Sequence, residues 1–247
     1  MNSKVSLVTG ASSGIGRNAA VTLAANGFSV IATARNKAGL EETKELCDGR
    51  LDCIVSDVTD ASSIDALFAE IKSKHGRLDL LFNNAGNALP QTNFGDLELE
   101  EFTKVMDVNA TGAFLVANRA YRMMRDQTPQ GGRIINNGSI SAHMPRPGSA
   151  PYTMSKHAIS GMTRTIALDG RAHNIACGQI DIGNAATDMT SQFSDGILQA
   201  DGSIRSEPTM DLQTVGDAVL HMANLPLDAN ILFMTVMATK MPYVGRG

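Results

Sequence analysis

The stretch TGASSGIG, Thr9 to Gly16, decides the fold of this chain. It follows a short apolar run and precedes an amphipathic run that closes at Gly27. Its three glycines, Gly10, Gly14 and Gly16, permit a tight turn in which backbone N–H groups approach a phosphate, and the following helix adds the positive end of its dipole. A second apolar run ends about twenty residues later, as a dinucleotide site requires. The stretch therefore predicts a strand, a phosphate-binding turn and a helix, and the alternative is a turn that merely needs small residues.

Apolar and amphipathic runs alternate along most of the chain. Runs typical of strands occupy residues 4–10, 29–35, 51–58, 78–86, 132–139, 174–183 and 231–238. Helical patterns occupy residues 14–27, 37–48, 61–76 and 109–127, and a long one begins near Tyr152. The strand runs are apolar throughout, which indicates burial on both faces. We therefore predict an α/β fold, a doubly wound parallel seven-stranded sheet (a Rossmann fold) with helices on both faces, in a single domain over residues 1–247.

One segment departs from this alternation. Residues 187–211, TDMTSQFSDGILQADGSIRSEPTMD, are polar and rich in turn residues. An insertion after the sixth strand lies where it can cover a pocket, so we expect a substrate lid. A surface loop without such a role is the alternative.

Composition excludes several classes of function. A formal net charge of -4, a pI near 5.7 and the absence of a basic run argue against nucleic-acid and membrane-surface partners. The three cysteines, Cys47, Cys53 and Cys177, show no metal-ligand spacing, so we expect reduced thiols and no metal site. No apolar run reaches the roughly 18 residues of a membrane helix. The start, MNSKVSLVTG, has no secretory pattern. We expect a cytoplasmic protein that handles small molecules or other proteins.

The end of the second strand bears on the choice of cofactor. Enzymes that use NAD commonly place an acid there to bind the ribose hydroxyls of the adenosine. Here Ala34 is followed by Arg35. A guanidinium can bind a 2′-phosphate bidentately, and nothing at these two positions repels one. The sequence therefore favours NADP(H) over NAD, and a solvated arginine at a strand end is the alternative.

The stretch YTMSK, Tyr152 to Lys156, places a phenol and an ammonium group four residues apart on one helix face. A nearby positive charge favours the phenolate. Tyr152 can then act as an acid in reduction and as a base in oxidation. Ser139 precedes it by thirteen residues and can donate a hydrogen bond to a substrate oxygen. Chance pairing on a helix surface is the alternative.

With TGASSGIG at the front and YTMSK further on, the chain resembles the short-chain dehydrogenase/reductase family nearly from end to end. The motifs NNAG (83–86), SDV (56–58) and DVNATG (107–112) fall between them in the family's order. The resemblance implies a catalytic tetrad of Asn109, Ser139, Tyr152 and Lys156, in which Lys156 also holds the nicotinamide ribose. Asn109 would anchor a water that links the lysine to solvent. The expected cofactor-binding residues are Gly10, Ser12, Ser13, Gly14, Ile15, Gly16, Arg35, Asp57, Val58, Asn84, Ala85, Gly86, Tyr152, Lys156, Gly183 and Thr187.

The sequence departs from the family pattern after the sixth strand. The family usually has Pro-Gly there, followed by a threonine, and this chain has Ile182, Gly183 and Thr187. In the family this stretch contacts the nicotinamide carboxamide, and loss of the proline removes a conformational restraint without removing the contact. Gln179 and Asp181 stand where apolar or asparagine residues are usual. The sequence leaves open whether Asp181 faces the cofactor or the outside.

For several other residues the sequence allows two interpretations. Ser141 can replace Ser139, although the spacing favours Ser139. His143 either lines the pocket or is a satisfied loop histidine. Arg146 either lies at the pocket mouth, where it would favour an anionic substrate, or lies on the surface. The C-terminal tail, MATKMPYVGRG, either reaches a neighbouring subunit or is frayed.

The resemblance also implies a homodimer or homotetramer, with contacts through the helices of residues 109–127 and those after Tyr152. Candidate contact residues, each of which is alternatively ordinary core, are Phe114, Tyr121, Met124, Met154 and Met162.

Three functions compete. The leading prediction is an NADP(H)-dependent oxidoreductase that interconverts a ketone or aldehyde and the corresponding alcohol. An epimerase or dehydratase of nucleotide sugars shares the tyrosine–lysine pair, but such chains usually add a larger substrate domain. A non-catalytic dinucleotide sensor would not need Ser139, Tyr152 and Lys156 together.

Overall fold

Seven parallel strands form the central sheet of the computed structural model, which describes residues 3–187, 190 and 196–244. The strand order is β3-β2-β1-β4-β5-β6-β9. The strands are β1 (Val5–Thr9), β2 (Ser29–Ala34), β3 (Asp52–Val55), β4 (Leu80–Asn83), β5 (Gly132–Asn137), β6 (Ile175–Gly183) and β9 (Phe233–Met237). The order runs outward in both directions from β1 and β4, which confirms the predicted doubly wound sheet.

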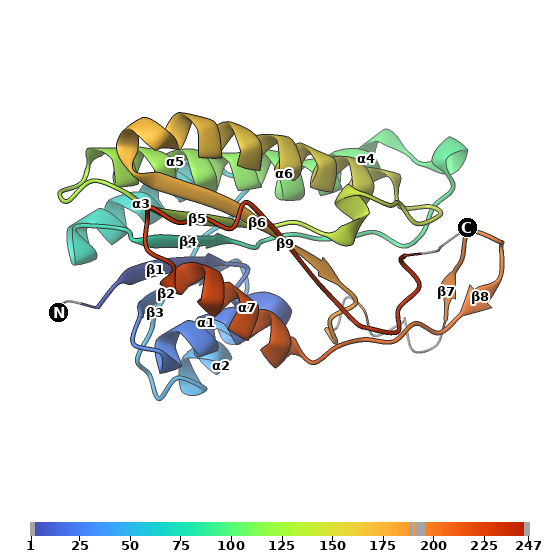
Figure 1. The fold of residues 1–247 in the computed structure, drawn as a ribbon, viewed down its shortest axis with the longest axis horizontal. Coiled ribbons are helices and arrows are strands. Elements are labelled where there is room, and N and C mark those ends of the chain that lie inside the picture. Colours follow the sequence, from blue (N-terminus) through green and yellow to red (C-terminus); the bar gives the residue numbers. More distant parts are fainter. Residues whose placement is uncertain (1–2, 188–189, 191–195, 245–247) are drawn as a thin grey trace.

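Helices cover both faces of this sheet, as Figure 1 shows. The helices are α1 (Gly14–Ala25), α2 (Lys37–Glu45), α3 (Ala61–His75), α4 (Leu99–Met106), α5 (Ala113–Asp126), α6 (Ala150–Asp169) and α7 (Leu212–Asn224). Side chains of α1, α2 and α7 pack in one apolar cluster on one face, and those of α3, α5 and α6 pack in a second cluster on the other. Every residue of β1, β4 and β6 is buried, which is the pattern that predicted burial on both faces.

Short polar side chains start several of these helices. The Oδ1 of Asn36 accepts a hydrogen bond from the N–H of Gly39 at the start of α2, and Asp60 accepts one from the N–H of Ser62 at the start of α3. Gly76 ends α3 in the left-handed conformation, with φ of 73°. Local sequence therefore sets the limits of these helices.

Four features go beyond the sequence prediction. Helices α4 and α7 were not predicted, and residues 107–112 form a π-helical turn ahead of α5. Within the segment expected to be a lid, β7 (Ile197–Leu198) pairs antiparallel with β8 (Ile204–Arg205). Residues 188–189 and 191–195 of that segment lie outside the described residues. The start of the C-terminal tail is part of the core, because Ala238 and Met241 are buried against Ile140.

Candidate active site

A cleft of about 280 Å³ opens at the carboxyl ends of β1, β4, β5 and β6. The strand order reverses between β1 and β4, and open parallel sheets bind ligands at such a point. The predicted site residues that line the cleft are Gly10, Ser13, Gly14, Ile15, Gly16, Asn84, Gly86, Ser139, Tyr152, Lys156 and Thr187. The predicted residues outside its lining are Ser12, Arg35, Asp57, Val58, Ala85, Asn109 and Gly183.

The turn after β1 has the form of a phosphate cradle. Gly10 and Gly14 have φ angles of 66° and 50°, in the left-handed region that favours glycine. A Cβ on Gly16 would lie 2.2 Å from the carbonyl oxygen of Gly10, so a larger residue would push α1 away from the strand. The side chain of Ser13, the residue before α1, does not cap the helix. It therefore does not occupy the first backbone N–H groups of α1.

Tyr152 and Lys156 both line the cleft from the first half of α6. The Lys156 Nζ lies 5.4 Å from the centroid of the Tyr152 ring. It also donates a hydrogen bond of 2.8 Å to the carbonyl oxygen of Asn137, at the end of β5. Lys156 is only 5% exposed, and a buried ammonium group needs such a partner. The two side chains thus lie near each other in the lining of the cleft.

Asn109 is buried behind this pair, in the π-helical turn Asp107–Gly112. Its Nδ2 donates hydrogen bonds to the carbonyl oxygen of Asn87 (2.8 Å) and to the Oγ of Ser155 (3.3 Å). The Ser155 hydroxyl donates in turn to the carbonyl oxygen of Tyr152 (2.7 Å). Asn109 is therefore connected to the backbone of Tyr152 through Ser155, a contact that the sequence did not predict.

Ser139 follows β5 and precedes a short 3-10 helix, Ile140–Ala142. Its Oγ accepts a hydrogen bond of 3.1 Å from the N–H of Ser141. Its own N–H donates a bond of 3.0 Å to the Oδ1 of Asp181. Ser141 lines the cleft as well. Both serines between which the sequence did not decide therefore reach the cleft, and the backbone N–H of Ser141 bonds to the Ser139 hydroxyl.

The family model described as "short chain dehydrogenase" matches residues 4–197 of the chain. The chain belongs to the short-chain dehydrogenase/reductase family. A 3beta-hydroxysteroid dehydrogenase of Mediterraneibacter gnavus is 35% identical over 194 residues, which cover 77% of this chain and 69% of that protein. The 3-oxoacyl-(acyl-carrier-protein) reductase FabG of Escherichia coli is 32% identical over 228 residues, 90% of each chain.

The solved structures agree with this assignment. The 3-ketoacyl-(acyl-carrier-protein) reductase from Brucella melitensis, complexed with NADH, superposes with a TM-score of 0.84 and 26% identity over 94% of this chain and 96% of that one. This short-chain dehydrogenase/reductase is thus an oxidoreductase of a family that uses nicotinamide dinucleotides.

Polar side chains surround the glycine turn in this cleft. Beside the glycine turn, Asn84 donates from Nδ2 to the carbonyl oxygen of Thr9 and accepts at Oδ1 from the Nδ2 of Asn137. The Oδ1 of Asn137 is buried in the cleft lining and receives no hydrogen bond from the part of the chain that the structure describes. Thr187 lies close to the glycine turn: a Cβ built on Gly14 would lie 3.4 Å from the Thr187 Cγ2. The glycine turn, Asn84, Asn137 and Thr187 therefore line the same cleft.

Apart from the buried Asn109, the predicted residues outside the cleft lining fall into two groups. Asp57, Val58 and Arg35 lie at the ends of β2 and β3, beyond the glycine turn. The Arg35 side chain is 70% exposed and its Nη1 lies 3.8 Å from the Oδ2 of Asp57. Ser12, Ala85 and Gly183 instead adjoin lining residues in the sequence, and the N–H of Ala85 donates a hydrogen bond to the Thr9 hydroxyl.

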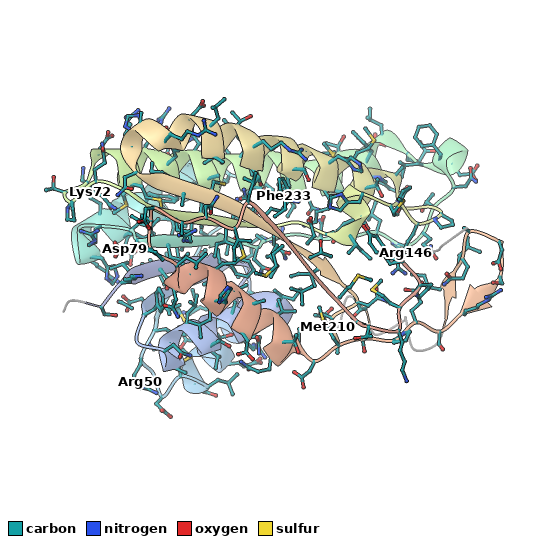
Figure 2. The ribbon with its side chains drawn as sticks, viewed as in Figure 1. Arg50, Lys72, Asp79, Arg146, Met210 and Phe233 are labelled. Atoms are coloured by element: carbon teal, nitrogen blue, oxygen red, sulfur yellow. The ribbon has the colours of Figure 1, made fainter. Side chains whose placement is uncertain are left out.

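Arg146 matches neither of its two interpretations. It lines the cleft, yet its side chain is only 10% exposed and lies 2.7 Å from the Glu207 carboxylate. Asn184 bonds to both partners. Figure 2 shows Arg146 on the side of the molecule that carries the β7–β8 hairpin. Burial pushes the pKa of Glu207 upward, but the hydrogen bonds from Asn184 and Gln199 and the charge of Arg146 outweigh it and hold this pKa below its ordinary value.

His143 and Asp181 form a pair that the sequence left unresolved. The Nε2 of His143 lies 2.9 Å from the Oδ2 of Asp181. Asp181 is fully buried on β6, so it faces neither the cleft nor the outside. His143 is outside the cleft lining, which favours the interpretation of a satisfied loop histidine.

Other classes of site are not supported. Among residues 3–187, 190 and 196–244, no group of three or more His, Cys, Asp or Glu is placed to hold a metal ion. Burial raises the pKa of the Cys177 thiol to about 12, which keeps it protonated and unreactive. Nor does any described helix have the length and apolar character needed to cross a bilayer.

Proposed function

We propose that this short-chain dehydrogenase/reductase is an NADP(H)-dependent oxidoreductase that interconverts a ketone or aldehyde and the corresponding alcohol. The observation that carries the proposal is the convergence of Ser139, Tyr152 and the buried Lys156 on one cleft beside the glycine turn. A sensor that only binds a dinucleotide would not need this convergence.

Each residue of the tetrad has a role that its contacts support. NADP(H), when bound, supplies or accepts the hydride. Ser139 donates a hydrogen bond to the substrate oxygen and orients it, while the Tyr152 hydroxyl gives that oxygen a proton in reduction and removes it in oxidation. Lys156 holds its ammonium group beside Tyr152, with the Nζ 5.4 Å from the centroid of the ring. Asn109 steadies the start of α6 through Ser155.

The preference for NADP(H) rests on Arg35. Its guanidinium is exposed at the end of β2, beyond the glycine turn, where the adenosine end of a dinucleotide lies in sheets of this type. The 3.8 Å separation from Asp57 is too long for a tight ion pair, so the guanidinium stays available to a 2′-phosphate. NAD is the alternative, and the relative from Brucella melitensis was solved with NADH.

The substrate that the cleft suits best is uncharged and largely apolar. Much of the lining beyond the tetrad is apolar, including Leu89, Leu97, Val105, Ile140 and Ile197. Arg146 is neutralised by Glu207 and does not present a free charge to an anionic substrate. The names of the two relatives, a hydroxysteroid dehydrogenase and a 3-oxoacyl reductase, both denote a secondary alcohol and ketone pair on an apolar skeleton.

Three further assignments belong to the same proposal. Residues 187–211 act as a substrate lid, since Thr187, Thr190 and Ile197 line the cleft. The enzyme is cytoplasmic, and it is a homodimer or homotetramer that pairs through α5 and α6. Phe114 and Met154 are 52% and 48% exposed on these helices, whereas Met124 is fully buried in the core and is not a contact residue.

The test is an absorbance assay of NADPH and NADH oxidation with a panel of ketones and aldehydes, and of the reverse reaction with alcohols. Turnover of at least one pair with a preference for NADPH is the expected result. Binding of the dinucleotide without turnover of any compound would favour the sensor, and isomerisation of a nucleotide sugar without net change of the cofactor would favour the epimerase.

A further inference from the structure

Asp181 lies directly beneath the turn that carries Ser139. Its Oδ1 accepts hydrogen bonds from the N–H of Ser139 (3.0 Å) and from the Nε2 of Gln179 (2.7 Å). A Cβ on Gly138 would lie 2.0 Å from that oxygen and 2.5 Å from the Gln179 Nε2, so the glycine is what allows both side chains to approach the turn. The other carboxylate oxygen faces His143.

Gln179 continues this polar chain to α6. Its Nε2 also donates to the Oγ of Ser160 (3.0 Å), and its Oε1 accepts from the hydroxyl of Thr163 (3.0 Å). The Ser160 hydroxyl donates to the carbonyl oxygen of Lys156, one helical turn away (3.3 Å). Asp181 and Gln179 together therefore connect the Ser139 turn to the helix that carries Tyr152 and Lys156.

The side chains that make this connection are buried, which restricts how the elements they join can be placed. Asp181, Gln179 and Thr163 are each 0% exposed, and a buried polar group is costly unless its hydrogen bonds are made. Apolar residues at positions 179 and 181 would fill the same space without that requirement. A fully bonded network instead allows one relative placement of the elements that it joins.

We propose that Asp181 and Gln179 are positioning residues that fix the Ser139 hydroxyl relative to Tyr152 and Lys156. The inference rests on the proposed function, because a fixed separation of these groups matters when they act on one substrate oxygen. A misplacement of about 1 Å in such a group can lower the rate about 100-fold.

The test compares Asp181→Asn, which keeps an oxygen acceptor at Oδ1, with Asp181→Leu, which keeps the size and removes the acceptor. We expect Asp181→Leu to lose about 10- to 100-fold in kcat with KM and NADPH affinity unchanged, and Asp181→Asn to keep most of the wild-type rate. Equal kcat in Asp181→Leu and wild type would overturn the inference. So would equal losses in both variants, or a loss of NADPH affinity that parallels kcat.

A second readout does not depend on turnover. In the resting protein, amide hydrogen exchange of residues 138–142 should be faster in Asp181→Leu than in wild type and unchanged in Asp181→Asn. Unchanged exchange in Asp181→Leu would overturn the inference. If the wild type reduces no carbonyl compound, the proposed function fails, and the exchange comparison alone decides whether Asp181 fixes the turn.

A milder variant covers the case in which Asp181→Leu does not fold. Ser160→Ala removes one hydroxyl from the chain and should lower kcat about fivefold, the value of one hydrogen bond. Thr165→Ala is the matched control, because the exposed Thr165 hydroxyl makes a similar bond within α6, to the carbonyl oxygen of Gly161. Equal kcat in Ser160→Ala and Thr165→Ala would overturn the inference.

Discussion

Replacing Glu207 by alanine should strongly destabilise the protein. The Glu207 carboxylate is 1% exposed and the Arg146 guanidinium 10%, with 2.7 Å between Oε2 and Nη2. Breaking a buried ion pair by removing one of its partners costs about 3–5 kcal/mol. That is a large part of the about 5–15 kcal/mol of a typical protein. At about 2–4 °C per kcal/mol for this chain length, the melting temperature should fall by about 6–20 °C.

Thermal unfolding followed by circular dichroism measures this effect, and the β7–β8 hairpin supplies the control. Asp201 and Arg205 form an ion pair of 2.6 Å in the same segment, but both side chains are more than half exposed. Solvent screens such a pair, so Asp201→Ala should leave the melting temperature close to that of the wild type. Similar small shifts in the two variants would refute the reasoning that the Arg146–Glu207 pair is buried and structural.

The Arg146–Glu207 ion pair also makes the stability of the folded protein depend on pH. Because the pKa of Glu207 is lower in the folded protein than its ordinary value of 4.5, its stabilising contribution is complete above that pH. The contribution is lost as the pH falls through the folded-state pKa. The difference in melting temperature between wild type and Glu207→Gln should therefore narrow below about pH 4.5, and a constant difference down to acid pH would contradict the assignment.

Three further predictions test other parts of the site. Arg35→Ala should weaken NADPH binding by about 1–3 kcal/mol and NADH binding far less, as measured by fluorescence titration; a wild type that already prefers NADH would refute this role. Gly16→Ala should abolish dinucleotide binding, since its Cβ would meet the Gly10 carbonyl oxygen, whereas Gly161→Ala, with nothing within 4 Å, should bind normally in the same titration. Light scattering at micromolar concentration should give a dimer or tetramer mass, and a mass near 26.1 kDa would reject it.

The sequence predicted the sheet and the cradle because both depend on local patterns. Seven apolar runs became seven parallel strands, since burial on both faces leaves a signal in the run itself. Gly10 and Gly14 could be recognised because their positive φ angles demand glycine at fixed positions after a strand. Tyr152 and Lys156 share a helix face through their spacing alone.

What the sequence missed depends on contacts between distant segments. From the sequence alone, Arg146 could lie in the pocket or on the surface. Only the fold shows that Glu207, 61 residues further on, lies beside it. Asp181 could face either way, because the direction of its side chain is set by the turn at Ser139 and by Gln179. The sequence makes Met124 a candidate interface residue. Only the packing of α5 against β5 at Gly132 shows that Met124 belongs to the core.

The central claim is that Tyr152 is the proton donor of a carbonyl reductase. The most direct test is NADPH oxidation by wild type and by Tyr152→Phe with the best substrate from the carbonyl panel, alongside NADPH affinity. The phenylalanine ring keeps the wall of the cleft and removes only the hydroxyl. We predict that kcat falls about 10²- to 10⁴-fold, the usual effect of losing a general acid, with NADPH affinity unchanged. Wild-type turnover in purified Tyr152→Phe would contradict the account.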